Sequence, residues 1–239
     1  MNIIYSFLQG LQLGGITMLL SSIIDNTISQ KETIELVRKD SQLYLDGLHS
    51  NYINLLLIGP LYYVVVYNFF LDNNKLGFIL GDYLQLVFIH NLFYYIAHFS
   101  MHKVFFMKFM HDFHHRFRET IPSTGNAVSM SEFNVAYVIP FVIGCLFVVP
   151  NNITLKMSVG TISLLNIFIH TPNFKNIPYS VYLVSPSNHL KHHENRSGTY
   201  SAPLLNIDYF IKETHIYLIY LKELLKLKIK FFIKNDNYN

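Results

Sequence analysis

Histidine is the residue type in this sequence whose number and spacing best suit chemistry. The chain has 12 histidines among 239 residues, and eight of them fall into three short runs. Within each run the spacing of three or four residues places side chains on one face of a helix, about 5–6 Å apart at Cβ. Neutral imidazole is the commonest metal ligand in proteins, so each run can direct two or three ligands at one point. The runs are His98 with His102, then His111, His114 and His115, then His189, His192 and His193.

The size of this histidine set predicts two metal ions. One pair of histidines four residues apart is a weak signal, because such pairs are often surface or core residues, but two copies of His-x-x-His-His are a much stronger one. A structural zinc takes four ligands and a catalytic zinc about three, so eight imidazoles are too many for one ion. A nitrogen shell suits Fe, Zn, Cu or Ni and argues against Mg or Ca. Ligand type alone does not separate iron from zinc.

Apolar segments surround these runs and indicate a membrane protein. Hydrophobic residues make up 51% of the chain and charged residues 14%, against about 25% charged in soluble domains. We expect an all-α fold, an integral membrane bundle of four to five apolar helices with a histidine-rich helical cap, forming a single domain over residues 1–239. A spanning helix needs about 20 apolar residues. The candidate stretches are 3–24, 52–71, 76–101, 133–150 and 153–170.

The last two stretches leave two possibilities open. They are short, and Pro140 and Pro150 lie in or beside them. Proline disrupts the hydrogen-bond ladder of a helix, so residues 133–170 form either two full spans or a shallow re-entrant hairpin.

The distribution of cationic residues predicts which side of the membrane the histidines face. If the stretches alternate in direction, the connections 25–51, 102–132 and 171–239 share one side. All but two of the 18 Lys and Arg residues, Lys75 and Lys156, lie in these connections. The positive-inside rule therefore predicts a cytoplasmic histidine cap. The net charge of +3 is spread along the chain, which argues against nucleic-acid binding.

The carboxyl-terminal segment 211–239 is predicted to be a basic amphipathic tail. Lys222, Lys226, Lys230 and Lys234 are four residues apart with apolar residues between them, which gives a cationic stripe on a helix. Such a helix can lie on anionic lipid, although an ordinary solvated helix face is nearly as good an interpretation.

The three runs, with their order and spacing, resemble the histidine boxes of the fatty acid hydroxylase/sterol desaturase superfamily. The resemblance covers about residues 80–210. Asn91-Leu-Phe-Tyr-Tyr is similar to the family's approach to the first box, and Thr199-Tyr200 followed by Asp208 is similar to an element after the third. His170, followed by Thr-Pro-Asn, resembles a further element that often supplies another ligand.

The sequence departs from the family pattern at three places. Ser129-Met-Ser-Glu132 stands where many members have His-Pro-x-Glu, which removes one possible ligand. Phe99 replaces a frequent Arg, and Ile207 replaces a usual Trp.

The resemblance implies an enzyme in which two irons use O₂ to attack a C–H bond of a membrane lipid, by hydroxylation, oxidation or desaturation. Zinc is a possible substitute metal in purified protein. Similarity around His111–Glu132 slightly favours a sterol over an acyl chain. Four carboxylates close to the boxes are candidates for orienting an imidazole through its outer nitrogen, although a solvated loop charge is an equally good interpretation of each: Asp112, Glu132, Glu194 and Asp208.

An external electron donor is also implied, because the sequence contains neither a nucleotide-binding glycine turn nor a cytochrome b5 element. In the family the donor is typically cytochrome b5 with its reductase, or a ferredoxin-type donor in bacteria, and the location is the endoplasmic reticulum in eukaryotes. Two other functions remain, a histidine-rich metal transporter and a zinc-dependent membrane hydrolase. Transport sites usually lie near the membrane midplane, and the zinc-hydrolase motif His-Glu-x-x-His is absent.

Overall fold

The computed structural model describes residues 2–72 and 74–236, with side chains described as far as Lys222. Within these residues the fold is helical without strands, and only an isolated bridge joins Leu183 to Leu205. The expected all-α class is therefore confirmed. The long helices of the bundle are α1 (Ile3–Thr27), α3 (Ser41–Ile53), α4 (Gly59–Phe69), α5 (Leu80–Lys103), α8 (Ile139–Val148) and α9 (Asn152–Ile169).

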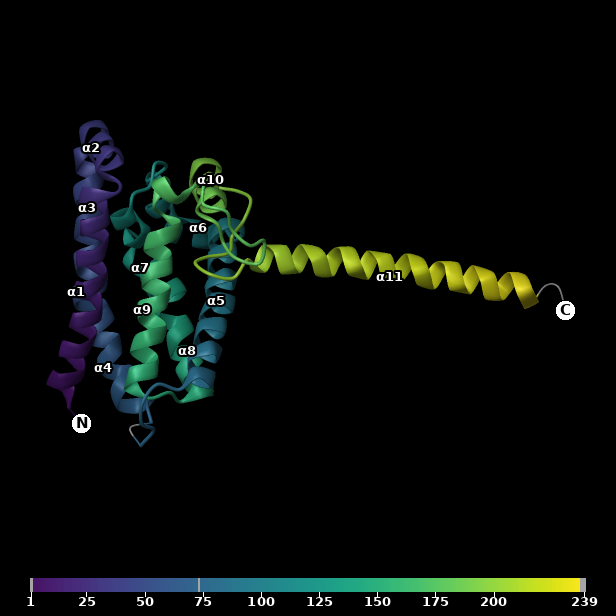
Figure 1. Ribbon diagram of the computed structural model, residues 1–239, viewed down its shortest axis with the longest axis horizontal. Coiled ribbons are helices and arrows are strands. Elements are labelled where there is room, and N and C mark those ends of the chain that lie inside the picture. Colours follow the sequence, from purple (N-terminus) through teal and green to yellow (C-terminus); the bar gives the residue numbers. More distant parts are fainter. Residues whose placement is uncertain (1, 73, 237–239) are drawn as a thin grey trace.

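Shorter helices gather at one end of this bundle, with α2 and α10 at the same end in Figure 1. The amino terminus of α1 and the turns after α4 and α8 lie at the other end. This arrangement places the three histidine runs on one side, as alternation of the helices requires. The elements of this cap are α2 (Gln30–Lys39), η2 (Phe105–Met107), α6 (Lys108–Asp112), η3 (His114–Arg116), η4 (Pro122–Asn126), α7 (Met130–Glu132), η6 (Pro172–Phe174) and α10 (Pro186–Asn195).

Four helical segments are long and apolar enough to cross a membrane: Ile3–Thr27, Ser41–Phe69, Met130–Val148 and Asn152–Ile169. The two segments that follow the histidine cap are thus spans by length and composition, and the turn between them contains Pro150. The stretch expected at 76–101 forms the 24-residue α5 but is not among the four. Its sequence contains His90, Asn91, His98 and His102, and the last two supply part of the histidine site.

Two of the spanning segments contain a π-helical turn just before a proline. The turn η1 (Asn54–Ile58) precedes Pro60, and η5 (Phe133–Val138) precedes Pro140. Proline has no N–H and its ring crowds the carbonyl four residues earlier, so the preceding turn widens. The second span therefore runs without a break from α3 through η1 into α4, and the third from α7 through η5 into α8.

Helix α1 packs closely against this second span through small residues. A Cβ added to Gly10 would lie 2.7 Å from Pro60 Cα, and one added to Gly14 would lie 1.9 Å from Leu55 O. Only glycine permits this approach, and small residues four apart are typical of helix contacts in membranes.

The carboxyl-terminal helix α11 (Ile207–Asp236) leaves the bundle sideways, roughly across the direction of the other helices (Figure 1). From Phe210 to Tyr220 its side chains are exposed. Of the lysines predicted to form a stripe, Lys226, Lys230 and Lys234 lie outside the residues whose side chains are described.

Candidate metal centre

Nine buried or half-buried histidines come together at the capped end of the bundle, and they form two groups. In each group one ring nitrogen from every residue lies within 4.8 Å of the others. The five-histidine cluster contains His98, His102, His111, His115 and His192, and the four-histidine cluster contains His114, His170, His189 and His193. All eight box histidines and His170 are thus included. His90, His49 and His215 belong to neither cluster.

The helical spacing of the boxes explains how they divide between the clusters. His111 and His115, four residues apart, point into the five-histidine cluster, while His114 points into the other. In the third box the pair four residues apart points into the other cluster: His189 and His193 belong to the four-histidine cluster, and His192 belongs to the five-histidine cluster. Residues at i and i+4 share a face of a helix, and their neighbour lies on the adjoining side. Each of these two boxes therefore serves both clusters.

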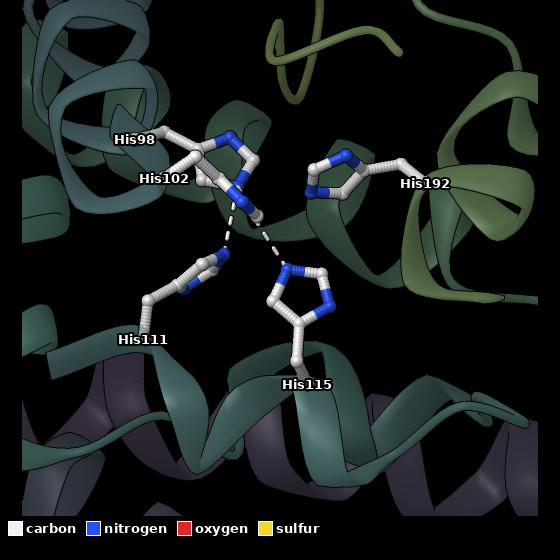
Figure 2. Close-up of side chains that lie close together, drawn as sticks. All are labelled: His98, His102, His111, His115 and His192. Atoms are coloured by element: carbon white, nitrogen blue, oxygen red, sulfur yellow. Dashed lines mark hydrogen bonds between the residues drawn. The ribbon is translucent and has the colours of Figure 1, made fainter. Parts of the chain in front are cut away.

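Figure 2 shows the five-histidine cluster, with the rings of α5, of the α6–η3 segment and of α10 directed toward a common centre. His98 Nε2 lies 2.8 Å from His111 Nε2 and 3.2 Å from His102 Nε2, and His102 Nε2 lies 3.2 Å from His115 Nε2. The first box is a pair one helical turn apart on α5, so both of its rings reach the same point.

Hydrogen bonds to the outer ring nitrogens fix which nitrogen faces inward. Backbone carbonyls can only accept, so four Nδ1 atoms must donate: His98 to Tyr200 O (2.7 Å), His114 to Ala127 O (3.2 Å), His170 to Asn166 O (2.7 Å) and His193 to Phe117 O (3.1 Å). Their Nε2 atoms are then left with free lone pairs, the form in which imidazole binds a metal.

The inward nitrogens fit a bound cation. His170 Nε2 and His193 Nε2 are 3.2 Å apart, although both rings carry their proton on the outer side. Two lone pairs held this close in a buried site repel unless a positive ion lies between them. His192 is buried as well, and neither of its ring nitrogens has a partner among the described residues. The donor set is therefore chemically suited to a first-row transition metal.

Burial keeps the cap histidines neutral. It lowers the pKa of His114 from 6.5 to about 4 and that of His170 to about 3. Burial, together with the neighbouring imidazoles, lowers the pKa of His192 to about 2 and that of His193 well below its usual value. At neutral pH these rings hold free lone pairs for a metal.

The four carboxylates that are candidates for orienting imidazoles lie in different surroundings. Glu132 is buried and its Oε1 is 2.6 Å from His111 Nδ1, so it orients that ring directly. Asp208 acts one step further out, because its Oδ2 accepts from the N–H groups of Tyr200 (2.7 Å) and Ser201 (2.8 Å), next to the carbonyl that binds His98. Asp112 instead faces Arg196 at 3.3 Å, with its side chain 64% exposed.

Glu194, the fourth carboxylate, lies on α10 and lines a surface cavity with Lys191 and Arg118. The structure places it beside cationic side chains of the cap surface. Ser129, at the position where many relatives have histidine, caps α7 by accepting from Glu132 N at 3.1 Å.

A buried loop that sequence reasoning did not identify completes the site. Residues 120–128 are all buried, and their backbone supplies the carbonyl that binds His114. Polar side chains of the first two spans bind this loop: Asp25 accepts from Ser123 N at 3.2 Å, and Asn51 donates to Ser123 O at 2.8 Å. The sequence does show polar residues, Asp25 and Asn51, within or at the ends of apolar helices. It does not show that they bind Ser123, because this partner lies about 70 to 100 residues away in the chain.

Asn91 has a comparable role on the other side of the site. Its Oδ1 accepts from Leu204 N (3.1 Å) and Leu205 N (3.2 Å), and its Nδ2 donates to Val87 O (2.8 Å). The amide thus joins α5 to the segment that follows Tyr200.

Comparison with known families agrees with this geometry. The fatty acid hydroxylase family matches residues 83–213, more than half of the chain, and this range includes all nine histidines. The protein therefore belongs to the fatty acid hydroxylase family, a family of lipid-modifying hydroxylases and oxygenases embedded in membranes. Searches among curated proteins and among solved structures found no significant match.

Proposed function

We propose that this protein is an O₂-dependent oxidoreductase that hydroxylates, oxidises or desaturates a C–H bond of a membrane lipid. The observation that carries the proposal is the pair of adjacent histidine clusters, five and four, in which outer hydrogen bonds to backbone carbonyls leave the inner nitrogens of His98, His114, His170 and His193 as lone pairs. A sterol remains slightly favoured over an acyl chain as substrate, from the sequence around His111–Glu132.

In this proposal each histidine cluster holds one iron. Imidazole also suits zinc, but zinc has no redox chemistry, so iron is the metal that fits the family's reaction. When bound, the two irons supply the activation of O₂ and the cleavage of the C–H bond. Purified protein can carry zinc in the same sites.

The residues of the chain have three tasks. Glu132 and the carbonyls of Tyr200, Ala127, Asn166 and Phe117 hold the imidazole rings in one orientation and one tautomer. Burial of the rings excludes water from their inner nitrogens. The bundle below the cap brings the lipid to them, since helices long and apolar enough for the bilayer lie directly beneath.

Electrons enter, in this proposal, at the exposed face of the cap. A surface cavity there is lined by His102, His111 and His115 together with Lys108, Arg196 and Asp112. The five-histidine cluster approaches solvent at this cavity, and two cations against one carboxylate leave its rim net positive, which suits an acidic donor such as cytochrome b5 acting with its reductase.

The proposal places the cap in the cytoplasm. The cationic connections gather at the capped end, which supports this orientation by the positive-inside rule. The sideways direction of α11 suits a basic helix that lies on the membrane surface, within a single membrane domain. In a eukaryotic cell the endoplasmic reticulum is the expected location.

The test uses full-length protein reconstituted with ferrous iron without oxygen and then given O₂, a chemical reductant and total membrane lipid. We expect O₂ consumption and new oxygenated or unsaturated lipids by mass spectrometry. His193→Ala should abolish both signals, whereas His49→Ala, at an exposed histidine outside the clusters, should retain them. Ion flux in vesicles without lipid oxidation would instead indicate a transporter, and O₂-independent lipid cleavage a zinc hydrolase.

A further inference from the structure

An apolar cavity lies inside the bundle, beneath the histidine cap. It is bordered by α1, α4, η5, α8 and α9 and encloses about 870 Å³ of empty space, its open side included. Along α9 its lining runs from Leu155 to Asn166, a rise of about 16 Å, or half of the apolar thickness of a bilayer. Two of its walls, α1 and α4, come from the part of the chain that precedes the family match.

Both π-helical turns of the bundle border this cavity. Leu55 comes from η1, and Phe133 and Tyr137 come from η5. A π turn is wider than an α turn and often marks a functional site. Because two separate spans widen at the same cavity, its shape is built into the positions of Pro60 and Pro140.

The end of the cavity nearest the cap is polar, and Asn126, one of the residues that line it, has a buried hydrogen-bond donor without a partner among the described residues. Asn166 Nδ2 donates to Asn126 Oδ1 at 3.0 Å and to Gly125 O at 2.8 Å. These two acceptors fix the orientation of both amides, so Asn126 must keep its own Nδ2 as a free donor. Asn126 is 6% exposed, and this Nδ2 has no partner among the described residues. A buried donor left unpaired costs free energy, which a ligand oxygen would recover.

The polar end also adjoins the four-histidine cluster. Asn166 O accepts from His170 Nδ1 at 2.7 Å, and Gly125 is so close to this ring that an added Cβ would lie 2.8 Å from Nδ1. One residue layer therefore separates the cavity from the cluster.

We propose that the cavity binds a neutral oxygen-bearing lipid, with its hydroxyl or carbonyl oxygen accepting from Asn126 Nδ2 and its apolar body extending along α9 toward Leu155. All residues that line the cavity are uncharged, so an ionised carboxylate would be buried there without a partner, at a large cost. In this orientation the carbons beside the oxygen lie nearest the four-histidine cluster. The inference rests on the proposed function in treating the lipid as a substrate, but its test measures binding alone.

The experiment uses the metal-free full-length protein in detergent and three photoactivatable, clickable probes of equal chain length: an alcohol, the carboxylic acid at pH 8, and an alkane. We expect the alcohol to label peptides covering 126–142 and 155–166, and the acid to label them at least about ten-fold less. Asn126→Ala should weaken the alcohol about ten-fold, the loss of one buried hydrogen bond, and leave alkane labelling unchanged. Equal labelling by acid and alcohol, or equal losses for alcohol and alkane, would overturn the inference.

A second pair of variants tests the place of binding. Val159→Phe adds a ring inside the cavity, whereas Leu164→Phe adds the same ring to the outer face of α9, where the side chain is 51% exposed. Alcohol labelling should be lost in the first and kept in the second, and Val142→Phe replaces the first if it does not fold. Alcohol binding without O₂-dependent turnover contradicts only the proposed function. Turnover with unchanged labelling in the filled variants contradicts only this inference.

Discussion

His111 and Glu132 form a buried pair in which the ring Nδ1 lies 2.6 Å from the carboxylate Oε1. The residues are 21 positions apart, and they join the short helix α6 to the beginning of the third span. Exchanging the carboxyl group for an amide should weaken His111 as a ligand, because outer partners of metal-binding histidines typically contribute 10–100-fold to affinity or activity. We therefore expect Glu132→Gln to lower activity by about 10–100-fold, with metal content of the five-histidine cluster reduced. Ser129→Ala removes the hydrogen bonds of Ser129 Oγ to Met110 O and Glu132 N but keeps the Glu132 carboxyl group, and it is the matched control. Full activity in Glu132→Gln would contradict the assigned role.

Metal content tests the division into two clusters. Purified protein should contain about two transition-metal ions per chain, one for each cluster. His102→Ala should leave the four-histidine cluster loaded, and His189→Ala the five-histidine cluster, so each variant should lose about one ion. Elemental analysis measures this directly, with His49→Ala as control. One ion or none in the unmodified protein would contradict a dimetal centre.

Membrane orientation is open to cysteine labelling. The native Cys145 is buried, so a cysteine introduced near Arg116 or Arg196 reports the capped end, and one at Asn74 reports the opposite end. A membrane-impermeant maleimide applied to sealed inverted vesicles should label the first two sites and leave Asn74→Cys unlabelled. The reverse pattern would refute the cytoplasmic orientation.

Stability of the metal-free protein should depend on pH in the acidic range. Burial lowers the pKa of His114 to about 4 and that of His170 to about 3, while both titrate near 6.5 when unfolded. Below pH 6.5 the unfolded chain therefore binds more protons than the folded one, and stability falls as the pH approaches 4. In EDTA the melting temperature should be lower at pH 5 than at pH 7.5. The double variant His114→Gln and His170→Gln should show a smaller difference, and an equal melting temperature in the unmodified protein would refute the effect.

The spacing of the histidines was sufficient to predict the residues that gather, since positions three and four apart on a helix lie near one another. It did not predict which cluster each histidine enters, because His111 and His114 are neighbours on the helix but belong to different clusters. The carboxylates show the same limit. Asp112 and Glu132 are similar candidates in sequence, but only tertiary packing turns Glu132 inward and leaves Asp112 beside Arg196.

For the fold, apolar runs located the long helices but not their full length. The second span begins at Ser41, whereas the apolar pattern predicted a start near residue 52. The prediction started too late because Gln42 and Asp46 interrupt the apolar pattern at the end of the span that packs beside the cap. The buried loop 120–128 has no periodic signal at all, since long-range partners such as Asp25 and Asn51 satisfy its backbone.

Because His192 and His193 are adjacent in the chain, they limit the distance between the two histidine clusters. His192 belongs to the five-histidine cluster and His193 to the four-histidine cluster. A single peptide unit of α10 therefore sets part of the distance between the two clusters. Bilayers differ in thickness, and spanning helices tilt or slide to match them. Such motion can carry α10 as a rigid body, but it cannot stretch the bond geometry between adjacent residues. The distance between the two metal sites therefore depends little on the thickness of the surrounding bilayer.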